Sequence, residues 1–374
     1  YLQRNVELLS RRVTENASRA GEHYITETRR EYLELVGSAM GAGLIIAVMA
    51  GLKLLLMNQK LAPLNEALAV CLNYGLGFVV IHLLHFTVAT KQPAMTANAI
   101  AASIDEGSGK ARDLHRLVDL IVRTVRSQLG AIFGNVVVAV PVAMGIALAL
   151  HGMTGSHYLD HAKALELLDA ANPLSGALFY AGIAGVCLFL SGLVAGYYDN
   201  LSAYDRIPER LMQLRWARRV LGEARLRRAA EYVGANLGAL AGNLLFGFML
   251  GGVSALGTLF GLPLDIRHIA FSSANAGYAV ASLDFQVLRP LLAYTVVGVG
   301  LIGIVNLVVS FFLALMVAMR ARRVTFAQGR ALGRLVWKRL LSRPGSFLWP
   351  GGADAGGATA DDMAKAASRP PTGP

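Results

Sequence analysis

The sequence predicts an all-α, polytopic integral membrane protein with six transmembrane helices, arranged as three hairpins, and with both termini in the cytoplasm. Only 16% of the 374 residues are charged, whereas a soluble domain carries about 25%. The apolar residues gather in long runs, and a run of about 18 or more can cross a bilayer as a helix. Backbone polar groups in lipid must be satisfied within the structure, so these runs are predicted to be helices.

Six apolar runs follow one another along the chain, and each is long enough to span a bilayer. In chain order they cover residues 36–57, 64–88, 129–150, 174–197, 237–262 and 290–319. Several contain glycines four residues apart, such as Gly37 and Gly41, and this spacing lets helix backbones approach closely in lipid. The third and fifth runs share a Leu-Gly-x-x-x-Gly-Asn pattern, beginning at Leu129 and Leu237. An old duplication and chance both explain this weak repeat.

Four polar segments flank the runs. Residues 1–35 are predicted to form a cytoplasmic helical segment, 207–232 a basic cytoplasmic helix, 320–345 a basic cytoplasmic segment and 346–374 a disordered tail. The tail is rich in Gly, Ala, Pro and polar residues, which cannot bury enough apolar surface to fold. The chain starts at Tyr1 rather than at Met, so we expect it to be the C-terminal part of a longer protein.

The placement of lysine and arginine predicts the orientation, because basic loops stay in the cytoplasm. The leading segment holds six, the loop after the second run six, the loop after the fourth run eight and the tail ten, which is 30 of the 35. The expected location is the bacterial inner membrane. The net charge of +11 is then explained by attraction to anionic lipid head groups, and nucleic acid is not an expected partner.

Polar side chains inside the runs are costly in lipid and therefore need a partner or a purpose. The candidates are Asn73, Tyr74, Asn135, Asn243 and Asn306. They either link neighbouring helices or line a polar cavity. Lys53, near the outer end of the first run, is expected to extend outward to water. Cys71 and Cys187 both lie in apolar runs, so core packing is expected for each, without a disulfide or metal spacing.

A second group of candidates is expected to meet at the cytoplasmic edge of the bundle and form a pocket. It comprises Glu22, His23, His82, His85, Lys91, Gln92, Tyr198, Asp199 and Asn200. His82 and His85 are three apart and would share a helix face, which suits a proton relay or an interhelical hydrogen bond. The alternative for the whole group is that its members are interface anchors, caps and solvated turns. No metal site and no cofactor are predicted.

Three long motifs resemble one family. They are ENASRAGEHYITETRREY (15–32), HLLHFTVATKQPAMTANAIAASI (82–104) and GYYDNLSAYDRIPERL (196–211). Together they resemble the bacterial membrane-protein family labelled "site-specific recombinase", Gcr type, which occurs mainly in beta- and gamma-proteobacteria. The resemblance extends to about residue 345. It implies a helical soluble region upstream of this chain and, from the label, an activity in DNA strand exchange.

Strand exchange needs a serine or tyrosine nucleophile, with arginine and histidine stabilising the transition state. The residues carry no such motif, because His82 and His115 are not followed by arginine three positions on. Phosphate-binding, nucleophile-elbow and HExxH motifs are also absent from the sequence, so no catalytic residue is predicted. Three functions remain open: a non-enzymatic transport or envelope-related protein, a membrane-tethered DNA recombination protein, and a scaffold. A second copy of the chain or its own upstream region are further possible partners.

Overall fold

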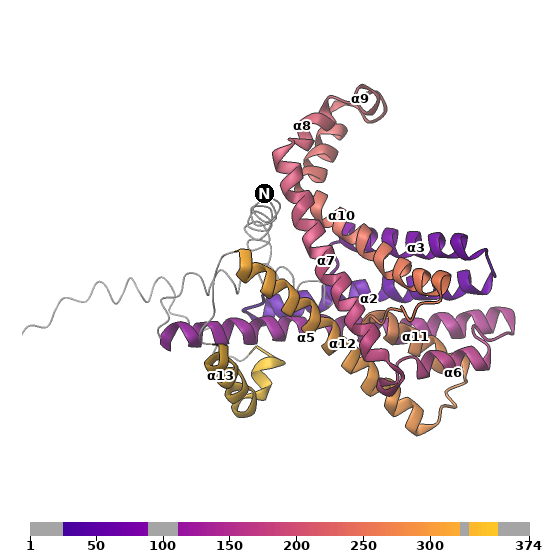
Figure 1. Ribbon diagram of the computed structural model, residues 1–374. Coiled ribbons are helices and arrows are strands. Elements are labelled where there is room, and N and C mark those ends of the chain that lie inside the picture. The colour runs from indigo at the N-terminus through magenta and orange to yellow at the C-terminus, as the bar shows by residue number, and fades with distance from the viewer. Residues whose placement is uncertain (1–24, 89–110, 322–328, 351–374) are drawn as a thin grey trace, which may run out of the picture.

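The computed structural model describes residues 25–88, 111–321 and 329–350, and within these ranges the regular structure is helical, without strands (Figure 1). Six of the described helices are long and apolar enough to cross a membrane. They are α2 (Arg29–Asn58), α3 (Pro63–Leu83), α5 (Ala111–Thr154), α7 (Ala177–Tyr204), α10 (Glu223–Phe260) and α12 (Arg289–Ala321). The prediction of a six-span, all-α membrane protein is therefore confirmed.

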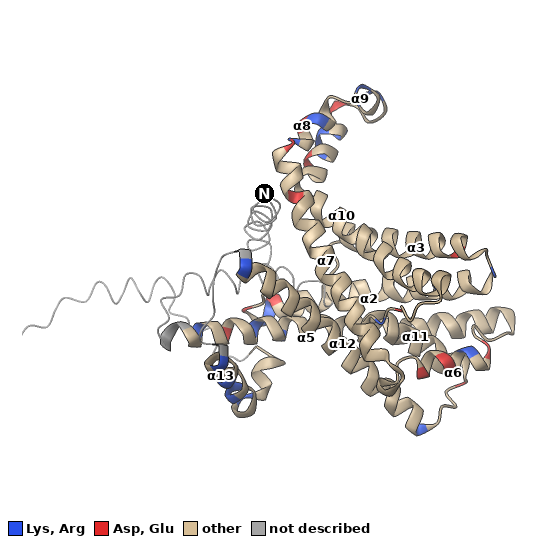
Figure 2. Ribbon diagram, in the orientation of Figure 1, with Lys and Arg blue, Asp and Glu red and all other residues tan. Residues whose placement is uncertain are grey.

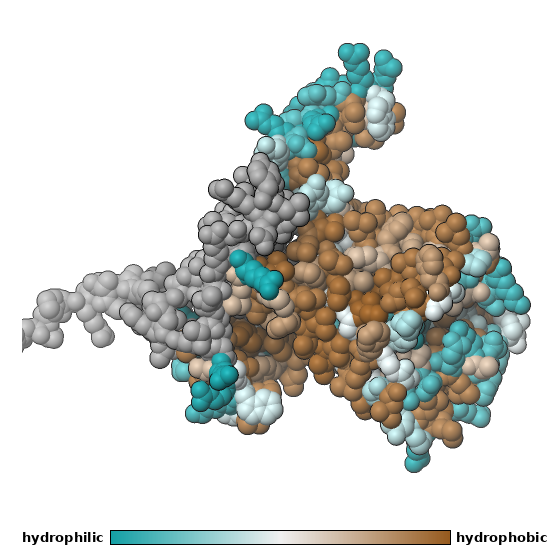
Figure 3. Space-filling model, in the orientation of Figure 1, coloured by the Kyte–Doolittle hydropathy of each residue, from teal (hydrophilic) through white to brown (hydrophobic). Residues whose placement is uncertain are grey.

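The outer surface of the bundle is apolar, as a lipid-facing surface must be. Along α3, Leu64, Leu68, Leu72 and Leu76 are all exposed at a spacing of one helical turn, and Leu64 is 70% exposed. Figure 3 shows a broad hydrophobic surface over the helix bundle, with hydrophilic residues at its two ends. Exposed apolar patches of this extent are rare on soluble monomers.

Helix α10 is central to the packing. It packs extensively against both α3 and α7, while α5 packs against α2 and α12 packs against α7. Of the three predicted hairpin pairs, α2–α3, α5–α7 and α10–α12, only α2 and α3 pack substantially against each other in the described part of the chain. The predicted grouping into three hairpins, with both termini in the cytoplasm, therefore stays a prediction.

Glycines make the closest helix contacts. A Cβ atom added to Gly134 on α5 would lie 2.6 Å from the carbonyl oxygen of Val36 on α2, and one added to Gly238 on α10 would lie 2.1 Å from that of Ala195 on α7. Both glycines belong to the Gly-x-x-x-Gly-Asn pattern of the weak repeat. The pattern thus has the same structural role in α5 and in α10, where it brings the helix backbone into contact with that of α2 and of α7, respectively.

Helices α5 and α10, with 44 and 38 residues, are much longer than the bilayer requires. The 44 residues of α5 correspond to about 66 Å, roughly twice the thickness of a hydrocarbon core. The first half of α5 packs through Val118 and Val122 against Phe347 and the apolar face of α13 (Gly329–Ser342). The ends of α7 and α10 extend away from the bundle and carry α8 (Ile207–Met212) and α9 (Arg215–Leu221); we call these four pieces the arm (Figure 1).

Two predicted boundaries are wrong. The basic segment 207–232 is not one helix, because Leu214 is extended and Gly222 has a φ of 74°, which separates α8, α9 and the start of α10. Residues 346–350 are not disordered: after the 3₁₀ turn η2 (Pro344–Phe347), Phe347 is buried and the Trp349 ring packs edge-on against Tyr32 with 5.3 Å between centroids. Residues 1–24, 322–328 and 351–374 of the predicted flanking segments lie outside the described residues.

A short helix that the sequence did not predict lies inside the bundle. Helix α11 (Ile269–Ser282) is buried along almost its whole length and packs against α5, α2 and the short helix α6 (His161–Asp169). Its 14 residues rise about 21 Å, which is too short to cross a hydrocarbon core of about 30 Å. We call the end of the bundle that carries α6 and the α2–α3 turn the α6 end.

Helix α11 begins at mid-bundle and ends near the α6 end. The backbone N–H of Ile269 donates to Oδ1 of Asn306, in the middle of α12, at 3.1 Å. Thirteen residues later, the Ser282 hydroxyl accepts from the N–H of Leu159, in the loop before α6, at 3.3 Å. After α10, the loop 261–268 leads into the middle of the bundle, and α11 runs from there back to the α6 end. This is the geometry of a re-entrant helix.

Candidate functional site

The predicted cytoplasmic pocket cannot be assembled from the described residues alone. Glu22, His23, Lys91 and Gln92 lie outside them. Helix α3 ends at Leu83, and His85 follows it with a φ of 57°, so the shared helix face expected for His82 and His85 is not formed.

Two of the remaining pocket candidates, His82 and Asp199, contact helix α10 at residues two positions apart. The His82 ring nitrogen Nε2 lies 3.3 Å from Oδ1 of Asn236. The Asp199 carboxylate accepts from the backbone N–H of Gly238 at 2.9 Å. Tyr198 packs edge-on against its neighbour Tyr197, and Asn200 is also engaged in contacts. The pocket itself stays a prediction, and these contacts fit the alternative that its members anchor helices.

Three of the intramembrane asparagines link segments of the bundle. Asn73 donates to the carbonyl of Met49 at 2.8 Å, and Asn135 donates to Ala39 at 2.6 Å and to Thr87 at 3.1 Å. Asn306 donates to Ala181 at 2.8 Å and to Arg267 at 3.0 Å. Asn243 donates to Ala239 of its own helix. These contacts are the interhelical hydrogen bonds that the sequence offered as one of two interpretations.

Tyr74 has a different position, because it lines a cavity at the α6 end. The cavity has a volume of about 500 Å³ and is bounded by α2, α3, α6, α10, α11 and the loop 261–268. A volume of roughly 300–1,000 Å³ is usual for a small-molecule site. The buried part of its lining, which we call the deep wall, contains Tyr74, His268, Phe271 and Ser272, together with the half-buried Asn275. Helix α11 therefore forms part of the deep wall, and its N-terminus carries the positive end of the helix dipole.

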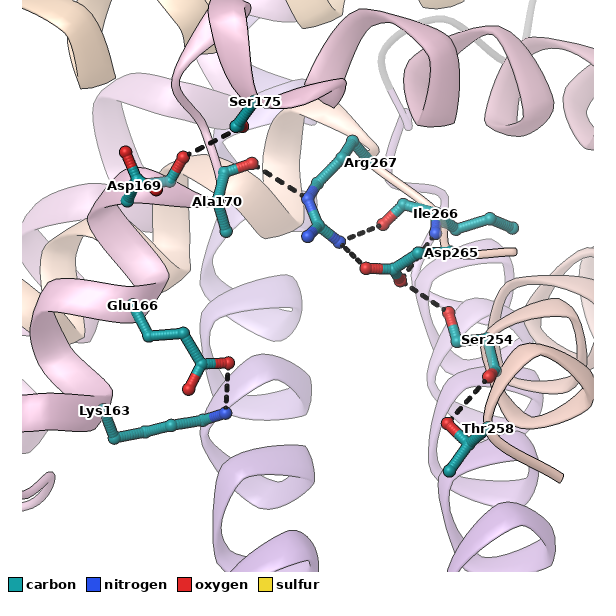
Figure 4. A network of polar contacts seen from close by, with 10 residues as sticks. All are labelled: Lys163, Glu166, Asp169, Ala170, Ser175, Ser254, Thr258, Asp265, Ile266 and Arg267. Atoms are coloured by element: carbon teal, nitrogen blue, oxygen red, sulfur yellow. Dashed lines mark hydrogen bonds and ion pairs between the residues drawn. The ribbon is translucent and has the colours of Figure 1, made fainter. Parts of the chain in front are cut away.

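Six charged side chains line this cavity: Lys53, Glu66, Lys163, Glu166, Asp265 and Arg267. Figure 4 shows the hydrogen-bonded network that holds the last four. Lys163 and Glu166 pair within α6 at 2.7 Å, and Arg267 pairs with Asp265. Arg267 also donates from Nε to the carbonyl of Ala170 at 3.0 Å, which joins the loop 261–268 to the loop after α6.

The Asp265 carboxylate is anchored from both sides. Its Oδ1 accepts from the Ser254 hydroxyl on α10 at 3.0 Å and from the N–H of Ile266 at 2.7 Å. The Arg267 guanidinium stacks over the Tyr180 ring on α7, 5.6 Å from the ring centroid. The loop 261–268 is thus held between α10, α7 and the loop after α6, which fixes the entry to α11.

Sequence reasoning missed most of this site. Asp265, Arg267 and His268 come from a segment that separates two apolar runs, and 14 residues of helix are too few to be recognised as a span. The signal that could have revealed the site is the grouping of Asp265, Arg267 and His268 within four residues, directly before a segment without charged residues. Lys53 lines the cavity, and the expectation that it extends outward to water stays a prediction.

A family model described as "Site-specific recombinase" matches residues 1–350. The chain belongs to this family. No curated protein and no solved structure matches the chain. The family assigned from the three sequence motifs is therefore confirmed over nearly the whole chain.

The site-specific recombinase family is named after a chemistry that the described site does not resemble. Strand exchange joins a Ser or Tyr nucleophile with Arg and His groups around a phosphodiester. The Arg267 guanidinium does lie over Tyr180, but it is engaged by Asp265 and by the carbonyl oxygens of Ile266 and Ala170. Within the described ranges, no group of three or more His, Cys, Asp or Glu side chains is arranged to hold a metal ion.

Proposed function

We propose that this member of the site-specific recombinase family is a non-enzymatic, multi-pass protein of the bacterial inner membrane that binds and transports a small solute. One observation carries the proposal: a polar cavity of about 500 Å³ penetrates the bundle at the α6 end and is bordered by a re-entrant helix. Discontinuous or re-entrant helices at mid-membrane are how many transporters build substrate sites. The α6 end is the end that the basic residues predict to face outward.

The distribution of charge supports this orientation. Figure 2 shows lysine and arginine gathered on the arm and on α13, with few at the α6 end. The charged residues that do lie at the α6 end include the six that line the cavity. The two sets of charges therefore have separate roles, with one fixing the orientation and the other shaping a binding site.

Adjacent serines on α11 provide the test. Ser272 lines the cavity, whereas Ser273 is 1% exposed and its hydroxyl donates to the carbonyl of Ala270. Each is replaced by cysteine in the full-length protein with Cys71 and Cys187 changed to alanine. A small, membrane-impermeant thiol reagent is then applied to intact cells and to inverted membrane vesicles.

We expect Ser272→Cys to react from the outside and Ser273→Cys to stay unreactive. Reaction of Ser272→Cys from the inside as well, at a rate that a bound solute changes, would indicate alternating access. Equal reactivity of the two cysteines, or no reaction at either, would contradict a solute pathway at this place.

The family description favours a second candidate, a membrane-tethered DNA recombination protein. The arm supplies a basic surface, because Arg218 and Arg227 are 55% and 62% exposed and share Glu223 as their acidic neighbour. The full-length protein in nanodiscs should then bind duplex DNA with a steep dependence on salt. Binding to anionic lipid vesicles without binding to DNA would assign the arm to the membrane surface instead.

A further inference from the structure

Of the six charged side chains that line the cavity, four form ion pairs with one another and two do not. Lys163 with Glu166, and Arg267 with Asp265, form two ion pairs. Lys53 and Glu66 remain, and neither forms an ion pair with the residues that the structure describes. Glu66 lies in the first turn of α3, where the helix dipole stabilises a negative charge. Asp265 and Glu66 are the described acids whose charges act on Lys53, and neither lies within ion-pair distance of its ammonium group.

Lys53 is placed where an ammonium group requires a counter-charge. It lies on the spanning helix α2, is partly buried, and lines the cavity beside the apolar side chain of Leu54. The Asp265 carboxylate lines the same cavity, but it already accepts from Arg267, Ser254 and Ile266. An ionisable group inside a membrane helix marks a functional site by default, because its desolvation must be offset.

Two further polar groups of the cavity lack a hydrogen-bond partner among the described residues. Tyr74 is only 5% exposed and lines the cavity, and its hydroxyl forms no hydrogen bond with any described residue. Asn275 also lines the cavity, and its side-chain oxygen has no partner among the described residues. The N-terminus of α11 lies on the same deep wall and is electropositive.

Apolar side chains make up the rest of the wall. Leu54, Val70, Leu250 and Phe271 all line the cavity. A ligand that fills this space therefore needs an apolar body as well as a charged group. A cavity of about 500 Å³ holds a compact organic molecule rather than a bare ion.

We propose that the cavity binds an organic anion, with a carboxylate or phosphate group on the Lys53 ammonium, a hydrogen bond from the Tyr74 hydroxyl and an apolar body against Phe271. This assignment rests on the proposed function, since it names the class of solute that the cavity takes. The same chemistry fits a free carboxylate and the phosphate of an anionic lipid, and both sources are tested below.

The test measures thermal unfolding of the purified full-length protein in detergent with added carboxylates, from butanoate to octanoate, and with the matching alcohols. A ligand that binds only the folded state raises the midpoint with concentration. We expect the carboxylates to stabilise the wild-type protein and the alcohols to have a weaker effect. Lys53→Met should lower the apparent affinity about tenfold or more, the amount expected for losing a charged hydrogen bond.

Three further variants separate the ammonium from general effects. Lys53→Arg keeps the charge and should retain binding. Lys60→Met removes the same charge from the exposed α2–α3 turn, outside the cavity, and should bind as the wild type does. Tyr74→Phe should weaken binding several-fold without abolishing it. Equal stabilisation of Lys53→Met and the wild type, or equal effects of alcohols and carboxylates, would overturn the assignment.

A lipid source is distinguished by repeating the titration with phosphatidylglycerol and with phosphatidylcholine in the same detergent. Stabilisation by the anionic lipid alone, lost in Lys53→Met, would identify the anion as a lipid phosphate. If Ser272→Cys is labelled from outside but no anion depends on Lys53, the solute pathway stands and the anion assignment fails. If Ser272→Cys is not labelled, the proposed function itself fails.

Discussion

Replacing Asn306 by alanine should loosen the re-entrant helix more than any other single loss of a polar side chain on α12. Asn306 is fully buried, donates to Ala181 and Arg267, and accepts from the N–H of Ile269. One side chain thus joins α12 to α7, to the loop 261–268 and to the start of α11. At about 0.6–1 kcal/mol for each hydrogen bond, plus about 1 kcal/mol for an N–H left unsatisfied, Asn306→Ala should cost about 3 kcal/mol.

Ser310 is a matched control on the same helix. It is 1% exposed, but its hydroxyl donates only to carbonyls of its own helix, those of Asn306 and Leu307. Ser310→Ala should therefore cost about 0.5 kcal/mol or less, within the range of minor substitutions. Equilibrium unfolding in mixed micelles measures both values. A loss for Asn306→Ala no larger than that for Ser310→Ala would refute the idea that this side chain holds α11 in place.

Three other outcomes are expected from the same unfolding assay. Gly247→Ala should cost about 2 kcal/mol, because the new Cβ would lie 2.3 Å from the backbone nitrogen of Gly75. Gly252→Ala, whose nearest neighbour is 3.9 Å away, should be nearly neutral. Equal effects of the two substitutions would contradict close backbone contact between α10 and α3 at Gly247. Thr28→Ala should cost about 1 kcal/mol, because it removes the capping box at the start of α2; an unchanged unfolding midpoint would show that the cap does not matter in the membrane. Tyr158 donates to the carbonyl of Gly51 at 2.7 Å, and burial raises the pKa of its hydroxyl to about 12. The contribution of the neutral Tyr158 hydroxyl to the free energy of unfolding should therefore be complete below about pH 10 and be lost as the pH rises to about 12. The stability of Tyr158→Phe should show no such fall over this pH range.

The six spans could be predicted because each is a long apolar run, and this signal is independent of tertiary contacts. The predicted limits differ from the helices mainly where helices continue into polar sequence, as α5 does for 18 residues before residue 129. Hydropathy detects the part of a helix in lipid, but hydrogen bonding continues beyond it. The α5 extension was therefore predicted only as part of a basic loop, and the arm as one basic helix over residues 207–232.

The cavity could not be predicted in the same way, because its residues come together only through tertiary packing. Lys53, Glu66, Lys163 and Asp265 belong to four different segments of the chain. The asparagines, in contrast, were correctly identified as costly, yet three of them serve to link segments. Asn135 follows Gly134, whose contact with Val36 places backbone carbonyls within reach of the amide.

The glycine positions on α10 explain why the cavity opens where it does. Gly238 and Gly242 contact α7, and Gly247 lies nine residues after Gly238, which is about two and a half helical turns. Gly247 therefore faces the opposite side of α10, where it and Gly251 contact α3 at Gly75 and Cys71.

The same face of α10 continues at Ser254 and Thr258, which line the cavity. The spacing of four, three and four residues along Gly247, Gly251, Ser254 and Thr258 keeps all of them on one stripe. Where the stripe consists of glycine, α3 and α10 are in backbone contact and the bundle is closed. Where it changes to hydroxyl side chains, Ser254 donates to Asp265 of the loop 261–268, and Ser254 and Thr258 line the cavity. A single change of residue type along one helix face thus marks the floor of the cavity.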